Sequence, residues 1–212
     1  MKDDQEKFLA YLAKKGMLTN AGFNSPRTLK EFFTGKQKID NKVSNNIEIK
    51  PTITVESKIY YKKMSLFDAP KNSIICHACN AQGVWGSGIA KEFKSLFPKA
   101  FEEYNQYCTM NLPFHLVGTA LITKPENSYR VGCLITSSDF GARLGAEQMI
   151  LTNTKNALDK LGQNCNEPIF YSNKFNSGLF KVPWEKTEKL INDFVKKYNK
   201  VWIICDPDLP NE

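Results

Sequence analysis

Residues 73–90 read S-I-I-C-H-A-C-N-A-Q-G-V-W-G-S-G-I-A, and this stretch decides the fold. Its apolar start, Ile74 to Cys76, is typical of a buried strand. Three glycines within residues 83–88 then interrupt the pattern. From Ile89 onward, apolar residues recur at three- and four-residue spacings, which predicts a helix. A glycine-rich loop between a strand and a helix brings backbone N–H groups and a helix N-terminus together, so it favours the binding of an anion.

A polar cluster, His77, Asn80 and Gln82, comes directly before these glycines. A glycine-rich loop alone can be a plain strand-to-helix turn, but an imidazole and two amides beside it favour a phosphate-bearing ligand. Histidine side chains titrate near pH 6.5 when unperturbed, which suits proton transfer near neutrality. A lone histidine is more often structural than catalytic, yet the position of His77 beside the loop favours a functional role.

The stretch resembles the macrodomain signature, in which a strand ending in Asn leads into G-x-G-I-A and a helix. Here these residues are Asn80 and then Gly86-Ser87-Gly88-Ile89-Ala90. Macrodomains bind ADP-ribose, and the resemblance implies that this loop holds the ligand from the diphosphate to the distal ribose. Within the family, the form H-x-C-N-x-x-G-x-W-G-x-G-I-A is similar to members that hydrolyse ADP-ribose 1''-phosphate. A second loop, N-S-G-L-F-x-V-P-W at residues 176–184, resembles the same members, as does T-S-S-x-F-G at residues 136–141.

The resemblance covers about the last three quarters of the chain and implies a site. His77 is expected to orient or deprotonate the attacking water, or to protonate the leaving hydroxyl, and Asn80 is expected to hold the distal ribose. The residues expected to bind substrate are Ser65, Leu66, Ala78, Cys79, Gly83, Val84, Trp85, Gly86, Ser87, Gly88, Ile89, Ser137, Asn176, Ser177, Gly178, Leu179 and Phe180. The implied function is hydrolysis of ADP-ribose 1''-phosphate to ADP-ribose and phosphate. The alternative is a module that binds ADP-ribose or a related nucleotide without turnover.

Two departures from the family pattern bear on specificity. Many macrodomains read the adenine amino group with an aspartate after the first strand, where this chain has Ser65. Macrodomains that remove ADP-ribose from glutamate use an aspartate in the second loop, where this chain has Phe180. We therefore expect no aspartate-dependent route here. The Phe180 ring is expected to pack against the distal ribose, and the alternative is a phenylalanine of the core.

Strands that alternate with long helices predict a three-layer α/β/α domain with a mixed sheet. The domain is expected over residues 51–212, after an N-terminal helical segment and linker over residues 1–50. Two short helices are expected in that segment, over residues 3–15 and from Ser25 to the stop at Gly35. Expected strands are 58–63, 73–79, 117–123, 129–137, 168–171 and 201–205, and expected helices are 88–108, 146–161 and 184–198.

The six cysteines are scattered, and most lie in apolar settings. Cys76 and Cys79 have C-x-x-C spacing, but on a strand their side chains would point to opposite faces. No second C-x-x-C or histidine pair completes a tetrahedral metal site. We therefore expect buried, reduced thiols, with no metal and no cofactor.

The net charge of +7 is uneven, since residues 1–50 hold ten Lys and Arg against six Asp and Glu. This balance favours an anionic partner, and we expect a small-molecule ADP-ribose derivative. We expect no nucleic-acid partner, because the lysines are not interleaved with aromatic residues in an RNA-binding pattern. No apolar run approaches the ~20 residues that cross a membrane, and the first residues lack the apolar core of a signal peptide, so a cytoplasmic protein is expected.

Overall fold

The computed structural model describes residues 18–19, 54–55 and 57–210. The chain divides into two compact units, Met1–Glu56 and Ser57–Glu212. In the first, β1 (Leu18–Thr19) pairs antiparallel with β2 (Thr54–Val55). The helices predicted over residues 3–15 and 25–35 lie outside the described residues, and the domain boundary at residue 50 stays a prediction. None of the described helices is long and apolar enough to cross a membrane.

The second unit is built on a six-stranded sheet with the order β3-β8-β7-β4-β6-β5. All neighbouring strands are parallel except the edge strand β5, which runs antiparallel to β6. The predicted mixed sheet is therefore confirmed. The strands are β3 (Lys58–Lys62), β4 (Ile74–Asn80), β5 (Ala120–Ile122), β6 (Arg130–Ser137), β7 (Ile169–Ser172) and β8 (Val201–Cys205).

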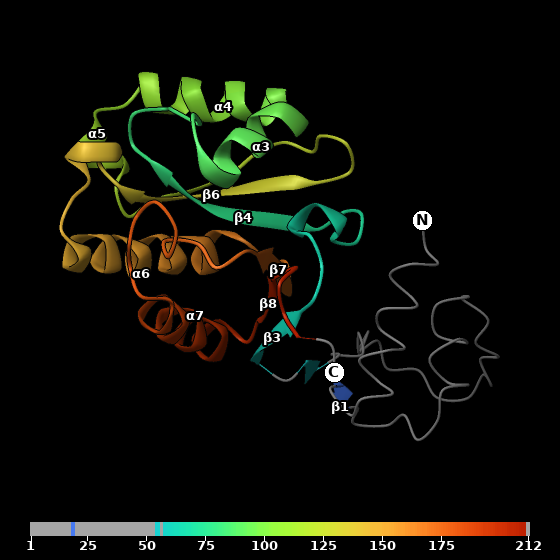
Figure 1. The fold of residues 1–212 in the computed structure, drawn as a ribbon. Coiled ribbons are helices and arrows are strands. Elements are labelled where there is room, and N and C mark those ends of the chain that lie inside the picture. Colours follow the sequence, from blue (N-terminus) through green and yellow to red (C-terminus); the bar gives the residue numbers. More distant parts are fainter. Residues whose placement is uncertain (1–17, 20–53, 56, 211–212) are drawn as a thin grey trace, which may run out of the picture. The chain divides into compact units, whose positions relative to one another are not determined.

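Helices cover both faces of this sheet, which confirms the three-layer prediction (Figure 1). On one face lie α3 (Gly88–Leu96) and α4 (Pro98–Thr109). On the other lie α6 (Glu147–Asn164) and α7 (Trp184–Tyr198). Because strand side chains alternate, β4 contributes to both layers.

The prediction of one helix over residues 88–108 was wrong in one respect: α3 and α4 are separate helices. Pro98 opens α4, and the proline ring disfavours helical backbone angles for the residue before it. Phe97 accordingly has φ −134° and ψ 63°, outside helical values. The sequence analysis also missed three short helical elements in stretches without predicted helix: α5 (Pro113–Leu116) and the 3₁₀ turns η1 (Leu66–Asp68) and η2 (Gly141–Arg143).

The parallel arrangement decides where a ligand can bind. Because β4, β6, β7 and β8 are parallel, their carboxyl ends, Asn80, Ser137, Ser172 and Cys205, meet at one edge of the sheet. Ligands of open α/β sheets bind outside this edge. The loops that follow β4, β6 and β7 all belong to it.

Candidate functional site

Asn80 folds the glycine loop at the end of β4. Its side-chain Oδ1 accepts the backbone N–H of Gln82 at 2.9 Å and that of Val84 at 3.3 Å. Its Nδ2 donates to the Val84 carbonyl at 2.7 Å. The Tyr104 hydroxyl of α4 donates to the Asn80 carbonyl at 2.5 Å. The amide is therefore engaged with the loop itself, and its side chain sets the loop's shape.

The later half of this loop is open to solvent. Gly86, Ser87 and Gly88 are exposed, and α3 begins at Gly88 with no side-chain cap from Ser87. Within the described part of the chain, the backbone N–H groups of Gly86 and Ser87 form no hydrogen bond. Free N–H groups at a helix N-terminus are suited to an anion such as a diphosphate.

The second predicted loop follows β7 and is held by Asn176, which is buried and has a positive φ of 65°. Its Oδ1 accepts from the Thr136 hydroxyl of β6 at 3.0 Å, and its Nδ2 donates to Thr154 of α6 at 2.8 Å. These bonds fix the loop's root and leave Gly178 and Leu179 exposed at its tip. The two loops therefore belong to one site, because Leu179 lies directly beside Gly88.

A third loop, after β6, joins the glycine loop through a contact that the sequence analysis missed. Gln82 Nε2 donates to the Ser138 carbonyl at 2.8 Å. The Ser137 hydroxyl donates to the Asp139 carbonyl at 2.6 Å, and Arg143 pairs with Asp139 at 3.1 Å. The side chain of Gln82 therefore joins the two loops, while the polar side chains of the third loop bond to one another.

His77 lies beneath the glycine loop, with no exposed surface. Its ring stacks on Phe93 of α3, with 4.1 Å between ring centroids, and meets the Trp85 ring edge-on at 4.7 Å. Its Nε2 is 3.5 Å from the Cys79 sulfur. The imidazole therefore sits between the sheet and α3, and a ligand on the loop surface would not touch it in this arrangement.

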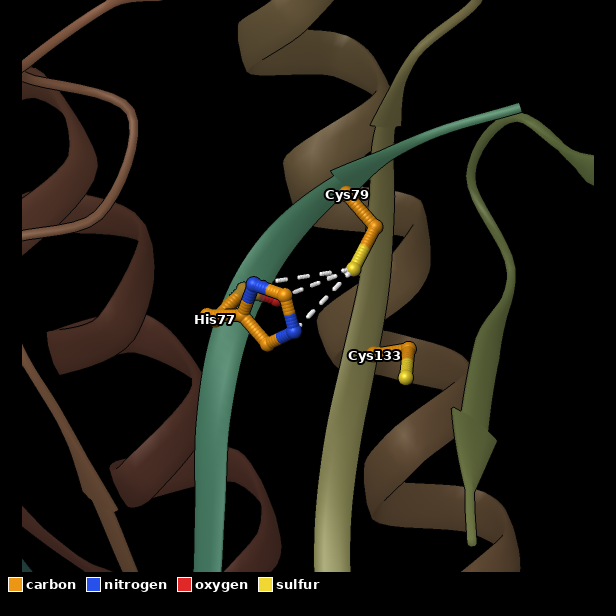
Figure 2. A group of neighbouring side chains, drawn as sticks. All are labelled: His77, Cys79 and Cys133. Atoms are coloured by element: carbon orange, nitrogen blue, oxygen red, sulfur yellow. Dashed lines mark hydrogen bonds between the residues drawn. The ribbon is translucent and has the colours of Figure 1, made fainter. Parts of the chain in front are cut away.

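The face of the sheet that carries His77 also holds two thiols, one on β4 and one on β6 (Figure 2). His77, Cys79 and Cys133 of β6 each place a ligand atom within 4.8 Å of the other two. Cys76, by contrast, belongs to the core under α6 and α7, so the predicted opposite orientation of the C-x-x-C thiols is confirmed. Burial alone raises the pKa of Cys79, but the Cys133 thiol and the His77 imidazole offset this and lower that pKa to about 5.

The other predicted site residues differ in how they are placed. Gly83, Trp85 and Leu66 are buried, and the half-buried Ala78 packs against the α6–α7 core. Ser65 accepts the Phe67 N–H at 3.3 Å and so caps η1. Val84 is exposed in the first loop, Ser177 and Phe180 are half-buried in the second, Ser137 is buried, and Ile89 opens the first turn of α3 half-buried.

The segment after β3 reaches the same layer as His77. Two strands, β8 and β7, separate β3 from β4 in the sheet. The Phe67 ring nevertheless packs on Phe93 with 5.1 Å between centroids. Because Phe67 contacts α3, the preceding residues Ser65 and Leu66 also lie toward that helix.

Comparison with known proteins agrees with this architecture. A family model described as "Macro domain" matches residues 76–191, a range that contains both loops. The chain is similar to the ADP-ribose 1''-phosphate phosphatase of Candida albicans, with 35% identity over 161 residues that cover 69% of this chain and 99% of the relative. It is also similar to the enzyme of the same name from Neosartorya fischeri, with 32% identity over 183 residues that cover 66% of this chain and 92% of the relative.

Two solved structures share the fold. The macrodomain of Mycobacterium tuberculosis DarG matches with a TM-score of 0.59 and 19% identity, over 72% of this chain and 99% of that one. Thermosipho africanus DarTG in complex with ADP-ribose matches with a TM-score of 0.59 and 15% identity, over 73% of this chain and 43% of that one. At these identities the likeness concerns the fold alone.

Proposed function

Because this chain belongs to the macrodomain family, we propose that it is a phosphatase that hydrolyses ADP-ribose 1''-phosphate to ADP-ribose and phosphate. The observation that carries the proposal is the similarity to fungal proteins of that name, at 32–35% identity over 92–99% of their length. In the reaction, water attacks phosphorus, the bond from phosphorus to the bridging oxygen breaks, and the leaving oxygen takes a proton.

The two loops support the binding of such a ligand. The open N–H groups of Gly86 and Ser87 and the N-terminus of α3 suit the diphosphate. Leu179 and Phe180 would cover the distal ribose from the second loop. Asn80 would act mainly by holding the first loop in shape, since its amide already bonds to Gln82 and Val84.

The assignment of His77 as the proton-transfer group stays a prediction, and its burial adds a requirement. For the ring to reach a phosphate ester, the layer formed by Trp85 and Phe93 must open, or a water molecule must enter between the ring and the ligand. Closure of the glycine loop around the ligand would supply such a movement.

The same burial favours a second candidate function, an ADP-ribose-binding module without turnover. In that case the His77 ring only packs between the sheet and α3. The glycine loop and the second loop would bind the nucleotide in the same way, so binding alone does not separate the two functions.

Phosphate release separates them. The full-length protein is incubated with ADP-ribose 1''-phosphate in the presence of a chelator, and binding of ADP-ribose is measured by calorimetry on the same preparation. Release of phosphate together with micromolar binding supports the phosphatase. Binding without release overturns it in favour of the binding module, and the absence of both overturns the ligand assignment. A small-molecule partner, no nucleic acid and a cytoplasmic location stay predictions.

A further inference from the structure

Three side chains that commonly bind metal ions meet in the core beneath the glycine loop. His77 of β4 and Cys133 of β6 are register partners, and Cys79 lies two residues beyond His77 on the same face of β4. One ligand atom of each lies within 4.8 Å of those of the other two, and Figure 2 shows the imidazole and the Cys79 thiol on the side of the strand that faces Cys133. We propose that His77, Cys79 and Cys133 form a binding site for a thiophilic metal ion, with Zn²⁺ as the ion that fits best.

One pair already has the separation that zinc requires. Zinc binds sulfur at ~2.3 Å and imidazole nitrogen at ~2.0–2.1 Å, so tetrahedral coordination places the two ligand atoms about 3.5 Å apart. The distance from Cys79 Sγ to His77 Nε2 is 3.5 Å. Because the same sulfur lies 3.8 Å from His77 Nδ1, the imidazole must turn to direct one nitrogen at the ion. The Cys133 thiol completes the set by a rotation about its side-chain bond.

The charges favour a divalent ion. His77, Cys79 and Cys133 are 0%, 1% and 0% exposed, so an unbalanced charge among them would be costly. Two thiolates and a neutral imidazole carry two negative charges, and Zn²⁺ cancels both. A monovalent copper ion would leave one negative charge buried. The set therefore suits Zn²⁺ better than Cu⁺.

A buried donor beside the cluster points the same way. The indole Nε1–H of Trp85 is buried and has no hydrogen-bond acceptor of good geometry among the described residues. Its ring lies edge-on to His77, with 4.7 Å between the two ring centroids. A thiolate bound to a metal ion remains a hydrogen-bond acceptor, so occupancy of the site would satisfy this donor.

The site differs from the one that the local sequence suggests. A C-x-x-C site would use Cys76, which faces the opposite core. The third ligand comes from β6 instead, more than fifty positions along the chain. Three protein ligands leave one coordination position of a tetrahedral ion for another donor.

Metal binding has a consequence that rests on the proposed function. A nitrogen that is bonded to zinc cannot accept a proton, so an occupied site would block proton transfer through His77. Zinc would then inhibit phosphate release. The site itself does not depend on this consequence, because the distances and charges concern the ligands alone.

The test titrates the reduced, chelator-treated full-length protein with Co²⁺, whose thiolate bonds and tetrahedral geometry give intense absorption, and then displaces it with Zn²⁺. We expect one equivalent of Co²⁺ per chain with a thiolate-to-metal band. Cys133→Ala should lose the band or weaken binding at least 10-fold. Cys76→Ala is the matched control, since it removes an equally buried thiol from the opposite face of the same sheet and should bind like the wild type.

The outcomes are separable. A folded wild type that shows no thiolate band overturns the site, as does a band that is unchanged in Cys133→Ala or lost in Cys76→Ala. Circular dichroism verifies folding, and Cys133→Ser replaces the alanine variant if the latter is unfolded.

The inhibition of phosphate release is tested separately. Zn²⁺ should lower phosphate release by the wild type and by Cys76→Ala but not by Cys133→Ala. Stoichiometric metal binding without inhibition would support the metal site but would contradict the proposal that the bound ion blocks proton transfer through His77. A protein that binds the metal but never releases phosphate overturns only the proposed function.

Discussion

The Cβ that Gly88 lacks would lie 3.2 Å from Cδ1 of Leu179, so the tips of the two loops are in direct contact. Gly88 also has a positive φ of 57°, which side chains other than glycine rarely adopt. It is the first residue of α3. The point where the loops touch is therefore the point where the helix N-terminus is open to an anion.

Gly88→Glu should abolish nucleotide binding. The new side chain would be crowded by Leu179, and its carboxylate would occupy the place of the anion and repel it. Calorimetry should show micromolar ADP-ribose binding by the wild type and much weaker AMP binding, because AMP lacks the diphosphate and distal ribose. Gly145→Glu is the control, since that glycine has open space around it. Equal affinity of the wild type for AMP and ADP-ribose would contradict the assignment of the loops.

His77→Ala and His77→Phe should both reduce phosphate release by roughly 10²–10⁴-fold, the usual contribution of a general acid–base group. The phenylalanine variant preserves stacking on Phe93 and contact with Trp85, so it separates the chemistry of the nitrogen from the packing of the ring. Affinity for ADP-ribose should change far less. If His77→Phe turns over substrate like the wild type while His77→Ala is merely destabilised, the ring serves only as part of the core.

Asn80→Ala should weaken both ligand binding and turnover. The variant leaves the N–H groups of Gln82 and Val84 without their acceptor, so the loop loses its fixed shape. We expect a loss of about 1–3 kcal/mol in the free energy of unfolding, measured in urea. Asn80→Asp keeps the acceptor oxygen and should retain more of this stability, although its charge should still weaken the binding of an anion. An alanine variant with normal affinity would show that the loop holds its shape without this amide.

A chain that starts at Val55 should fold and bind ADP-ribose as the full-length protein does. The sheet, the three loops and the core of the second unit all lie within Ser57–Glu212. Circular dichroism and calorimetry on both chains make the comparison. Loss of binding with the fold retained would mean that the first unit contributes to the site.

Lys174→Met should lower stability at neutral pH and have no effect in strong acid. The hydrogen bond from Lys174 lowers the pKa of Asp206 at the end of β8. A lowered pKa stabilises the fold above the ordinary pKa of the carboxyl, and this contribution is lost as the pH falls through the lowered value. The pair is partly exposed, so the difference should be at most about 1 kcal/mol. The control is Lys189→Met, which replaces an exposed lysine on α7. An equal loss of stability in both variants would show that the ion pair is not the cause.

Local signals in the sequence were enough for most of the elements, and the bonds that shape the first loop are also local. The predicted bounds of α7 and β8 agree with the structure at both ends. Helix α7 follows from an amphipathic period that starts after Pro183, and β8 follows from a short run of apolar residues. Neighbouring residues encode both signals. The Asn80 bonds to Gln82 and Val84 also join residues two and four positions apart. The break at Phe97 was equally local, and Pro98 was the signal that would have revealed it.

The tertiary structure decided which of these residues meet, because contacts between distant residues depend on the order of the strands. His77 is polar and follows an apolar run, but only the packing of α3 on the sheet buries it against Phe93. Cys133 gives no sign in the sequence of lying beside His77; the register of β4 on β6 places it there. Leu179 reaches Gly88 because β7 lies next to β4 in the sheet, whereas β5 and β6 come between them in the sequence.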